Sequence, residues 1–138
     1  MNDTAAKVSG RPLSLADLVE RGTRAPDHAA EARALAGLAR SLAERPENGL
    51  EALARTIVEM GLAGSACVSL LDPSGQCFRW SATAGAWARH AGRVMPYGAS
   101  PCAVVLDAAA PLLFRQPHET FPALVGEPPI NEVLLMPF

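Results

Sequence analysis

Residues 65–84 read SACVSLLDPSGQCFRWSATA, and this stretch decides the local fold. Its first part, Ser65–Leu71, is short, apolar and partly β-branched, which is typical of a β-strand. Asp72-Pro73-Ser74-Gly75 follows, and Asp, Pro and Gly each favour a tight turn for a different physical reason. After the turn, Gln76–Ala84 alternates between apolar and polar residues. The sequence therefore predicts an antiparallel β-hairpin.

The alternation in the second strand predicts which of its side chains are buried. The apolar face carries Phe78, Trp80 and Ala82. The other face carries Cys77, Arg79, Ser81 and Thr83. One apolar and one polar face indicate a strand that is buried on one side only. We therefore expect the three apolar side chains to point together into the core.

Two amphipathic helices are predicted upstream of the hairpin. Pro26 suits the first turn of a helix and Asp27 complements the helix dipole there, so the first helix begins at this point; Pro46 stops it. Its apolar stripe has helical spacing and consists of Ala32, Leu35, Leu38, Ala39 and Leu42. Because the many alanines of Ala29–Ala43 allow close approach, we expect this helix to contact a second copy of the chain.

The second helix is predicted to begin at Asn48, a favourable N-cap that Glu51 completes as a capping box. Gly61 predicts a left-handed cap at its other end. Its apolar positions are Leu50, Leu53, Ile57 and Met60. We expect this stripe to face the core against the sheet.

The two ends of the chain are patterned differently. Residues 1–25 are polar and weakly patterned, so we interpret them as a flexible leader, in which Ser14 and Asp17 predict the start of a short helix. Residues 85–110 are irregular, and Ser100-Pro101 opens a predicted short helix within them. Further on, short strands are predicted at Pro111–Phe114 and Val133–Phe138, with a loop or single helical turn at Pro117–Leu124.

Composition narrows the class of protein. The chain has 138 residues, 49% of them hydrophobic, and a net charge of −2, which favours one domain and excludes a highly charged disordered chain. The helices and strands predicted above make this domain α+β. The charge balance gives no footprint of a nucleic-acid binder. No uncharged run is long enough to span a membrane and no secretory signal is visible, so we expect a cytoplasmic protein. Cys67, Cys77 and Cys102 form no CxxC pair and predict buried thiols, not a disulfide framework.

Beyond the hairpin, the order helix, helix, strand, turn, strand, long irregular segment, strand, loop, strand resembles the GAF domain. The motifs similar to one bacterial subgroup are Ala63-Gly64-Ser65-Ala66, Phe78-Arg79-Trp80, Ala84–Ala88, Ser100-Pro101-Cys102, Val105-Leu106-Asp107, Pro111–Phe114, and Pro128-Pro129-Ile130 with Glu132. The resemblance covers residues 26–138. It implies a GAF-like antiparallel sheet, with the N-terminal helices packed on one face and a ligand-side loop region on the other.

The resemblance also implies a function. The subgroup is found at the front of bacterial sensor histidine kinases, in two-component signal transduction. It implies a cytoplasmic sensory or regulatory module that binds a small ligand or a partner and catalyses no reaction of its own. It further implies a homodimer, formed through the N-terminal helices or through exposed strand edges.

Two features depart from the family pattern. Ala103 stands where the family usually has a glycine after Ser-Pro-Cys. The chain also ends at Phe138, whereas a GAF domain continues with a turn, another strand and a closing helix, so the resemblance implies a domain truncated at its C-terminus. The apolar Val133–Phe138 suits a strand paired on both edges and covered on both faces. With the missing strand absent, we expect Val133–Phe138 and Ser65–Leu71 to expose edges that favour dimerisation or aggregation, unless these two strands pair directly with each other.

The resemblance places a small-molecule pocket beside the irregular stretch after the hairpin. Its expected lining combines aromatic bodies with a few polar tips. The candidates are Trp87, His90, Met95, Tyr97, Cys102 and Phe121. Alternatively, Trp87 and Tyr97 only fill the core, as large aromatic side chains most often do. The sequence indicates no particular ligand or cofactor.

No catalytic or metal-binding motif is present, and His28, His90 and His118 lie far apart in the sequence. The sequence therefore predicts neither catalytic residues nor metal ligands. Two other functions stay open. One is a thiol-based redox sensor or enzyme centred on Cys102, whose reactivity a helix start at Ser100-Pro101 would raise. The other is a truncated GAF fragment that acts as a dimerisation element.

Overall fold

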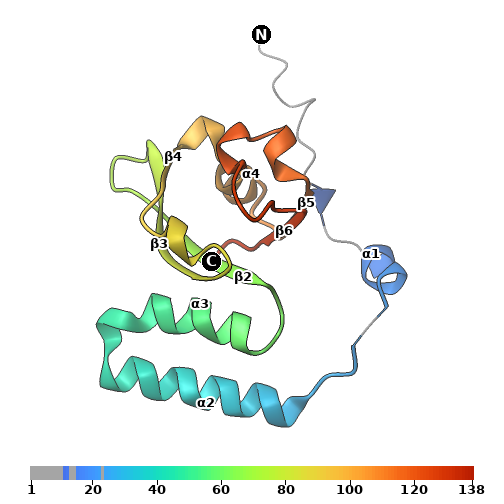
Figure 1. The fold of residues 1–138 in the computed structure, drawn as a ribbon, viewed down its shortest axis with the longest axis vertical. Helices are drawn as coiled ribbons and strands as arrows, with labels where there is room; N and C mark the ends of the chain where they lie inside the picture. Colours follow the sequence, from blue (N-terminus) through green and yellow to red (C-terminus); the bar gives the residue numbers. More distant parts are fainter. Residues whose placement is uncertain (1–10, 13–14, 23) are drawn as a thin grey trace. The chain divides into compact units, whose positions relative to one another are not determined.

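A computed structural model describes residues 11–12, 15–22 and 24–138 (Figure 1). The chain is α+β, as predicted, and combines helices with two antiparallel sheets. It divides into two compact units. The first, Arg24–Val94, is called the hairpin unit, and the second, which combines Met95–Phe138 with the described residues before Arg24, is called the C-terminal unit.

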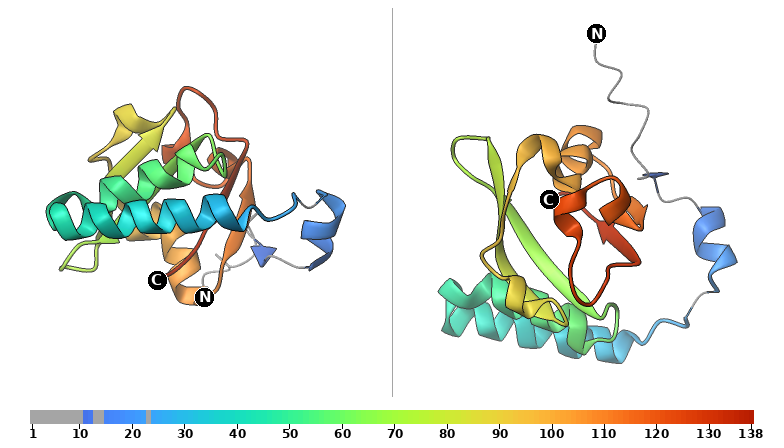
Figure 2. Two further views of the ribbon diagram at one scale, coloured as in Figure 1. Left: turned by 90° about the horizontal axis from the view of Figure 1, so that it is seen from below. Right: turned by 45° about the horizontal axis from the view of Figure 1, so that its top comes forward.

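Two helices open the hairpin unit. They are α2 (His28–Glu44) and α3 (Gly49–Glu59), joined by the 3-10 turn η2 (Pro46–Asn48), and they run side by side (Figure 2). Asp27 is the N-cap of α2, and its carboxylate accepts a hydrogen bond of 2.9 Å from the Ala30 N–H. Both predicted helices are confirmed, although Asp27 precedes the first turn of α2 instead of lying within it.

The ends of α3 follow the sequence signals in part. Asn48 is the N-cap, but its side chain makes no capping hydrogen bond, so the predicted capping box with Glu51 is wrong. Met60 ends the helix, and Gly61 has a φ of +69°, the left-handed conformation that glycine adopts without a Cβ clash. The predictions of the N-cap position and of the terminal glycine are confirmed.

The hairpin predicted from residues 65–84 is confirmed (Figure 2). Strands β2 (Ser65–Leu71) and β3 (Cys77–Gly85) pair antiparallel. The Gly75 N–H donates to the Asp72 carbonyl oxygen at 2.9 Å, which closes the turn between them, and Gly75 has a φ of +72°. The sheet continues as β2-β3-β4, and β4 begins at the residue where the hairpin unit ends (Val94–Pro96).

The Asp72 carboxylate organises this turn. It accepts hydrogen bonds from the Ser74 hydroxyl at 2.6 Å and from the N–H groups of Gln76 and Cys77 at 3.1 and 3.2 Å. These hydrogen bonds, led by the one from Ser74, lower the pKa of Asp72 from 3.8 to about 2. The folded hairpin therefore favours the charged form of this carboxyl group.

The hairpin contains a β-bulge. Ala82 is paired with Val68 but Trp80 is paired with Ser69, so Ser81 is an extra residue on β3. Val68 and Ser69 are neighbours in β2 and point to opposite faces of the sheet. Their partners Ala82 and Trp80 therefore also lie on opposite faces.

The bulge corrects the predicted distribution of side chains on β3. Phe78 and Trp80 share a face, as expected, and are 2% and 7% exposed. Ala82 is also buried, but on the other face, so the prediction that all three share one face is wrong. Thr83 was predicted on the face opposite to Trp80, but it lies on the same face. Thr83 is paired with Cys67 and Trp80 with Ser69, and these two partners lie on one face of β2.

The face that carries Ala82 is covered by α3. Ala54 of α3 is fully buried in a cluster with Val68 and Ala82, and the partly buried side chains around this cluster are Leu50, Leu53, Ala66 and Ala84. The predicted packing of the second helix against the hairpin is therefore confirmed. By contrast, α2 packs on α3 and contains no fully buried residue.

The C-terminal unit contains an antiparallel sheet in the order β1-β5-β6. Its strands are β1 (Arg11–Pro12), β5 (Leu112–Arg115) and β6 (Glu132–Leu135). The other elements of this unit are α1 (Leu15–Glu20), η4 (Tyr97–Ala99), α4 (Pro101–Ala108), η5 (Pro117–Glu119) and η6 (Pro122–Leu124). The predicted strand near Pro111 and the helical turns around 117–124 are thus confirmed.

Two predicted helix starts fall in this unit. Ser100 is the N-cap of α4, where its hydroxyl accepts a hydrogen bond of 3.2 Å from the Cys102 N–H, and Pro101 is the first helical residue, as predicted. The short helix predicted within residues 1–25 is present as α1. Its predicted cap, Ser14, and residues 1–10 of the predicted leader lie outside the described residues.

The last strand is shorter and more exposed than predicted. β6 ends at Leu135, three residues before the predicted end of the strand at Phe138. It lies at the edge of its sheet and pairs there with β5, so the expected exposed edge of this strand is confirmed. Its burial alternates, since Val133 and Leu135 are half-buried and Leu134 is exposed. This alternation is the pattern of a strand covered on one face only. β2 and β6 belong to different sheets.

An ion pair connects α1 to β6. Arg21 forms a bidentate pair with the carboxylate of Glu132, one branch of which measures 2.7 Å. The Arg115 Nε lies 3.6 Å from the same carboxylate.

No helix in the described part of the chain is long and apolar enough to cross a membrane.

Candidate ligand site

The six predicted lining residues divide between the two units. Trp87 and His90 belong to the hairpin unit. The C-terminal unit holds Met95, Tyr97, Cys102 and Phe121. The structure brings the rings of Trp87 and His90 into contact. A single concavity that includes all six residues stays a prediction.

The chain leaves β3 in a conformation that directs it back over the hairpin. Gly85 has a φ of +80°, which favours glycine. Directly after it, the Ala86 N–H donates to the Gly64 carbonyl oxygen at 3.1 Å, and the Trp87 N–H donates to the Ser65 hydroxyl at 3.1 Å. In the strand alternation, Ser65 lies on the same face as Ser69 and hence as Trp80. These contacts therefore bring Trp87 to the face that carries Trp80.

Four side chains assemble on this face, and we call them the indole–guanidinium cluster: Trp80, Trp87, His90 and Arg93. The two indole rings have centroids 5.7 Å apart at 47°, and the Trp87 and His90 rings are 4.4 Å apart at 41°. The Arg93 Cζ lies 5.6 Å from the Trp80 ring and 5.9 Å from the Trp87 ring. Both distances are within the range of cation–π attraction.

Backbone hydrogen bonds hold the cluster to β3. The Trp80 N–H donates to the Arg93 carbonyl oxygen at 2.8 Å, and the Gly92 N–H donates to the Trp80 carbonyl oxygen at 2.8 Å. The Arg93 N–H also donates to the His90 carbonyl oxygen, at 3.2 Å. The aromatic and cationic side chains are therefore carried by a hydrogen-bonded segment and not by a loose loop.

Three buried polar atoms at this face have no hydrogen-bond partner among the described residues. They are the Ser69 Oγ, the His90 Nε2 and the Arg93 Nη1. Ser69 is the strand partner of Trp80, and the other two belong to the cluster itself. Within the described part of the chain, no carboxylate forms an ion pair with Arg93. Buried polar atoms and charges are normally satisfied, because an unpaired one loses its hydration without compensation.

Sequence reasoning identified Trp87 and His90 but missed Ser69, Trp80 and Arg93 as site residues. Trp80 was interpreted as a core residue, and the bulge that turns it toward His90 and Arg93 leaves no sequence signal. Arg93 does have one: it is the last charged residue before the uncharged stretch Val94–Leu106.

Two of the four candidates of the C-terminal unit, Tyr97 and Phe121, contact other side chains of that unit. The Tyr97 hydroxyl donates to the Asp107 carboxylate at 2.9 Å, and this hydrogen bond raises the pKa of Tyr97. Met95 is fully buried. Phe121 packs edge-on against Phe114, with ring centroids 5.8 Å apart.

The three cysteines are free thiols, but none of them is fully buried, so the predicted burial is wrong. Cys102 is half-buried near the start of α4, and no hydrogen-bond partner of its sulfur is found within the described ranges. Cys67 is exposed and pairs with the Thr83 hydroxyl at 3.6 Å. Burial, and secondarily the charge of Asp72, raises the pKa of Cys77. No group of three or more His, Cys, Asp or Glu residues that could hold a metal ion occurs in the described part of the chain.

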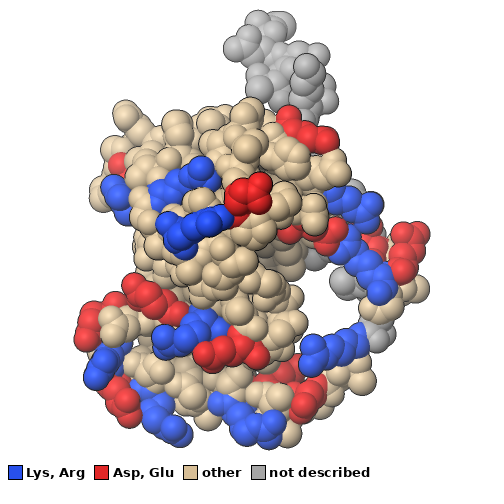
Figure 3. Space-filling view, in the orientation of Figure 1, with Lys and Arg blue, Asp and Glu red and all other residues tan. Residues whose placement is uncertain are grey.

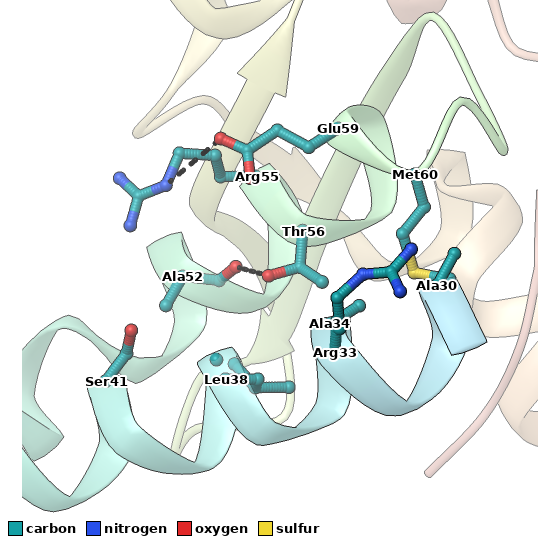
Figure 4. Close-up of a pocket in the computed structure, with 11 residues that line it drawn as sticks. Ala30, Arg33, Ala34, Leu38, Ser41, Ala52, Arg55, Thr56, Glu59 and Met60 are labelled. Atoms are coloured by element: carbon teal, nitrogen blue, oxygen red, sulfur yellow. Dashed lines mark hydrogen bonds and ion pairs between the residues drawn. The ribbon is translucent and has the colours of Figure 1, made fainter. Parts of the chain in front are cut away.

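A groove with a volume of about 390 Å³ lies between α2 and α3 (Figure 4). Two of its lining polar groups already pair within α3: the Thr56 hydroxyl donates to the Ala52 carbonyl oxygen at 2.7 Å, and Arg55 lies 3.8 Å from Glu59. Acidic and basic side chains alternate along these helices without forming a patch of one sign (Figure 3). Arg33 also lines the groove and forms no ion pair with the described residues, but it is exposed, whereas the Arg93 Nη1 is buried.

Comparison of the chain with protein-family models, curated proteins and solved structures finds no match.

Proposed function

We propose that this chain is a GAF-type sensory or regulatory module that binds a small ligand at the indole–guanidinium cluster and catalyses no reaction of its own. The observation that carries the proposal is the set of three unpartnered buried atoms, on Ser69, His90 and Arg93, beside two indole rings. A bound molecule would supply the partners that these atoms lack within the chain.

The chemistry of the cluster suits recognition. A guanidinium group binds planar anions through a fixed fork of donors, and indole rings bind flat or apolar surfaces. The position of the cluster, in the segment directly after the hairpin, agrees with the pocket position that the GAF resemblance implies. The resemblance also places such a module in bacterial two-component signalling, ahead of a histidine kinase. The ligand would then bias the hairpin unit through β3, to which the cluster is hydrogen-bonded.

The ligand-binding proposal can be tested with the two tryptophans of the chain. Their indole N–H groups give two assignable signals in a proton–nitrogen NMR spectrum, and Trp80→Phe and Trp87→Phe variants assign them. A library of bacterial metabolites is added to the full chain, and we expect at least one compound to shift both signals in a saturable manner. If compounds that bind the chain shift other residues and leave both indoles unchanged, the cluster is not the ligand site.

A homodimer is the second part of the proposal, and it rests on α2. Leu35 and Leu42 are 68% and 46% exposed, and Ala32 and Ala39 are exposed as well. These four residues follow one another at steps of three, four and three, which is the spacing of a helix–helix seam. They lie outside the set of α2 residues that line the groove toward α3. An apolar seam of this kind on a charged helix suits a second copy of the same helix.

The dimer is tested by Leu35→Glu, with Leu62→Glu as the matched control because Leu62 is similarly exposed, at 65%, but lies outside α2. Light scattering after size-exclusion chromatography, over a dilution series, measures the mass. We expect wild type and Leu62→Glu to be dimers that dissociate on dilution, and Leu35→Glu to be a monomer at every concentration. A wild-type monomer, or equal behaviour of the two variants, contradicts the α2 dimer. A dimer without any ligand response would favour the dimerisation element over the sensor.

A further inference from the structure

We infer that the ligand of the indole–guanidinium cluster is a small monocarboxylate with an apolar or aromatic body. This inference rests on the proposed function, because it names the chemical class of the ligand at that site. It is carried by the charge and the unused hydrogen-bonding groups of the cluster.

The first step concerns the sign of the ligand's charge. Arg93 keeps a permanent positive charge, its Nη1 is buried without a hydrogen-bond partner, and the described residues provide no carboxylate for it. The faces of Trp80 and Trp87 attract the guanidinium but accept no hydrogen bond in its plane. The group that completes this environment is an anion placed at the Nη1 edge of the guanidinium.

The second step concerns the size of that charge. The cluster carries one permanent positive charge, on Arg93. The other unpartnered buried atoms are the ring nitrogen Nε2 of His90 and the hydroxyl oxygen of the neighbouring Ser69. One cation balances one negative charge, and the two oxygens of a carboxylate match the guanidinium fork. A phosphate group has more oxygens and carries up to two negative charges, and proteins usually hold it with several backbone N–H groups at a helix start or a nest. The segment that carries the cluster contains only the three-residue turn η3.

The third step concerns the body of the ligand. Trp80 and Trp87 are both buried, and their rings meet at 47° beside the guanidinium. The surface next to the unused donor is therefore apolar and aromatic. A carboxylate attached to an apolar or aromatic group fits such a surface better than one attached to a sugar or a polyol.

The test uses four probes at matched ionic strength: sodium benzoate, sodium acetate, sodium phosphate and neutral benzamide. Thermal unfolding and the two indole NMR signals are followed for the full chain. The variants are Arg93→Gln and Arg93→Lys, with Arg79→Gln as control, because Arg79 is an exposed arginine on the same strand as Trp80 but on the opposite face.

We expect benzoate to raise the unfolding temperature of wild type by about 4–6 °C at a tenfold excess over its Kd, by mass action on the folded state. Acetate should act in the same direction at higher concentration, and benzamide should bind about tenfold or more weakly, since it lacks the charge. Arg79→Gln should respond like wild type. Arg93→Gln should lose the response, and Arg93→Lys should lose most of it, because an ammonium group cannot reproduce the fork.

Several outcomes would overturn the inference. If benzamide shifts the indole signals as strongly as benzoate, the cluster binds a ligand but charge does not select it, so the proposed function stands and the carboxylate does not. A stronger Arg93-dependent effect of phosphate would assign the other anion class. If neither benzoate nor acetate raises the wild-type unfolding temperature above the chloride control, the carboxylate site is refuted even if both Arg93 variants fail to fold.

Discussion

Gly85 directs the chain from β3 toward Trp87 and the candidate site. The variant Gly85→Ala tests whether the chain requires a glycine at this position. Gly85 has a φ of +80°, and a Cβ added to it would overlap the Gly64 carbonyl oxygen and lie 2.9 Å from the Ser65 Cα. Both obstacles are backbone atoms at the start of β2, so no side chain can move aside. The substitution therefore combines conformational strain with a backbone clash.

The chain contains controls that separate these two effects. Gly92 has a φ of +82° with nothing within 4 Å of an added Cβ, so Gly92→Ala isolates the conformational strain. We expect it to lower the free energy of unfolding by about 1–2 kcal/mol. Gly64 has no left-handed φ and no neighbour within 4 Å, so Gly64→Ala should change stability by less than about 1 kcal/mol.

For Gly85→Ala the clash adds about 1–3 kcal/mol, the cost of forcing extra volume into a packed site, to the same conformational strain. We therefore expect a total loss of about 2–5 kcal/mol, measured by urea unfolding of the full chain with tryptophan fluorescence as the signal. Because Gly85 directs the chain toward Trp87, the indole NMR signals of the folded variant should shift as well. Equal stability of Gly85→Ala and Gly92→Ala would refute the close approach of Gly85 to the start of β2.

Two further predictions concern the hairpin. Trp80→Ala should lower the free energy of unfolding by about 3–5 kcal/mol, since Trp80 is buried among ring neighbours. The control is the exposed residue Arg79, and Arg79→Ala should change the free energy of unfolding by about 0.5 kcal/mol or less. A loss below about 1 kcal/mol for Trp80→Ala would contradict the burial. Because the pKa of Asp72 is lowered from 3.8 to about 2, its charge stabilises the folded state above pH 3.8, and this contribution is lost as the pH falls through about 2. The stability difference between wild type and Asp72→Asn should therefore shrink over this pH range, and a difference that stays constant down to pH 2 would show that the charge has no role.

The local elements were predictable because local chemistry decides them. The turn at Asp72–Gly75, the N-cap at Ser100 and the left-handed Gly61 each follow from one or two residues whose backbone preference no tertiary contact has to override. The one-sided burial of β6 was not predictable in this way. An apolar run such as Val133–Phe138 has the same composition whether one or both of its faces are covered, and the elements packed on the sheet decide which.

The candidate site depends on a single inserted residue that periodicity cannot reveal. An alternating strand without a bulge would place Trp80 on the face of Ala82, against α3, where it would be a core residue as the sequence suggests. Ser81 changes the phase of β3, so that Trp80 points away from α3 and meets the segment that returns after Gly85. The same change of phase allows Arg93 to reach the Trp80 ring. The bulge thus converts a core tryptophan into part of a cluster with an unpaired cation, and bulges commonly re-aim side chains next to functional sites in this manner.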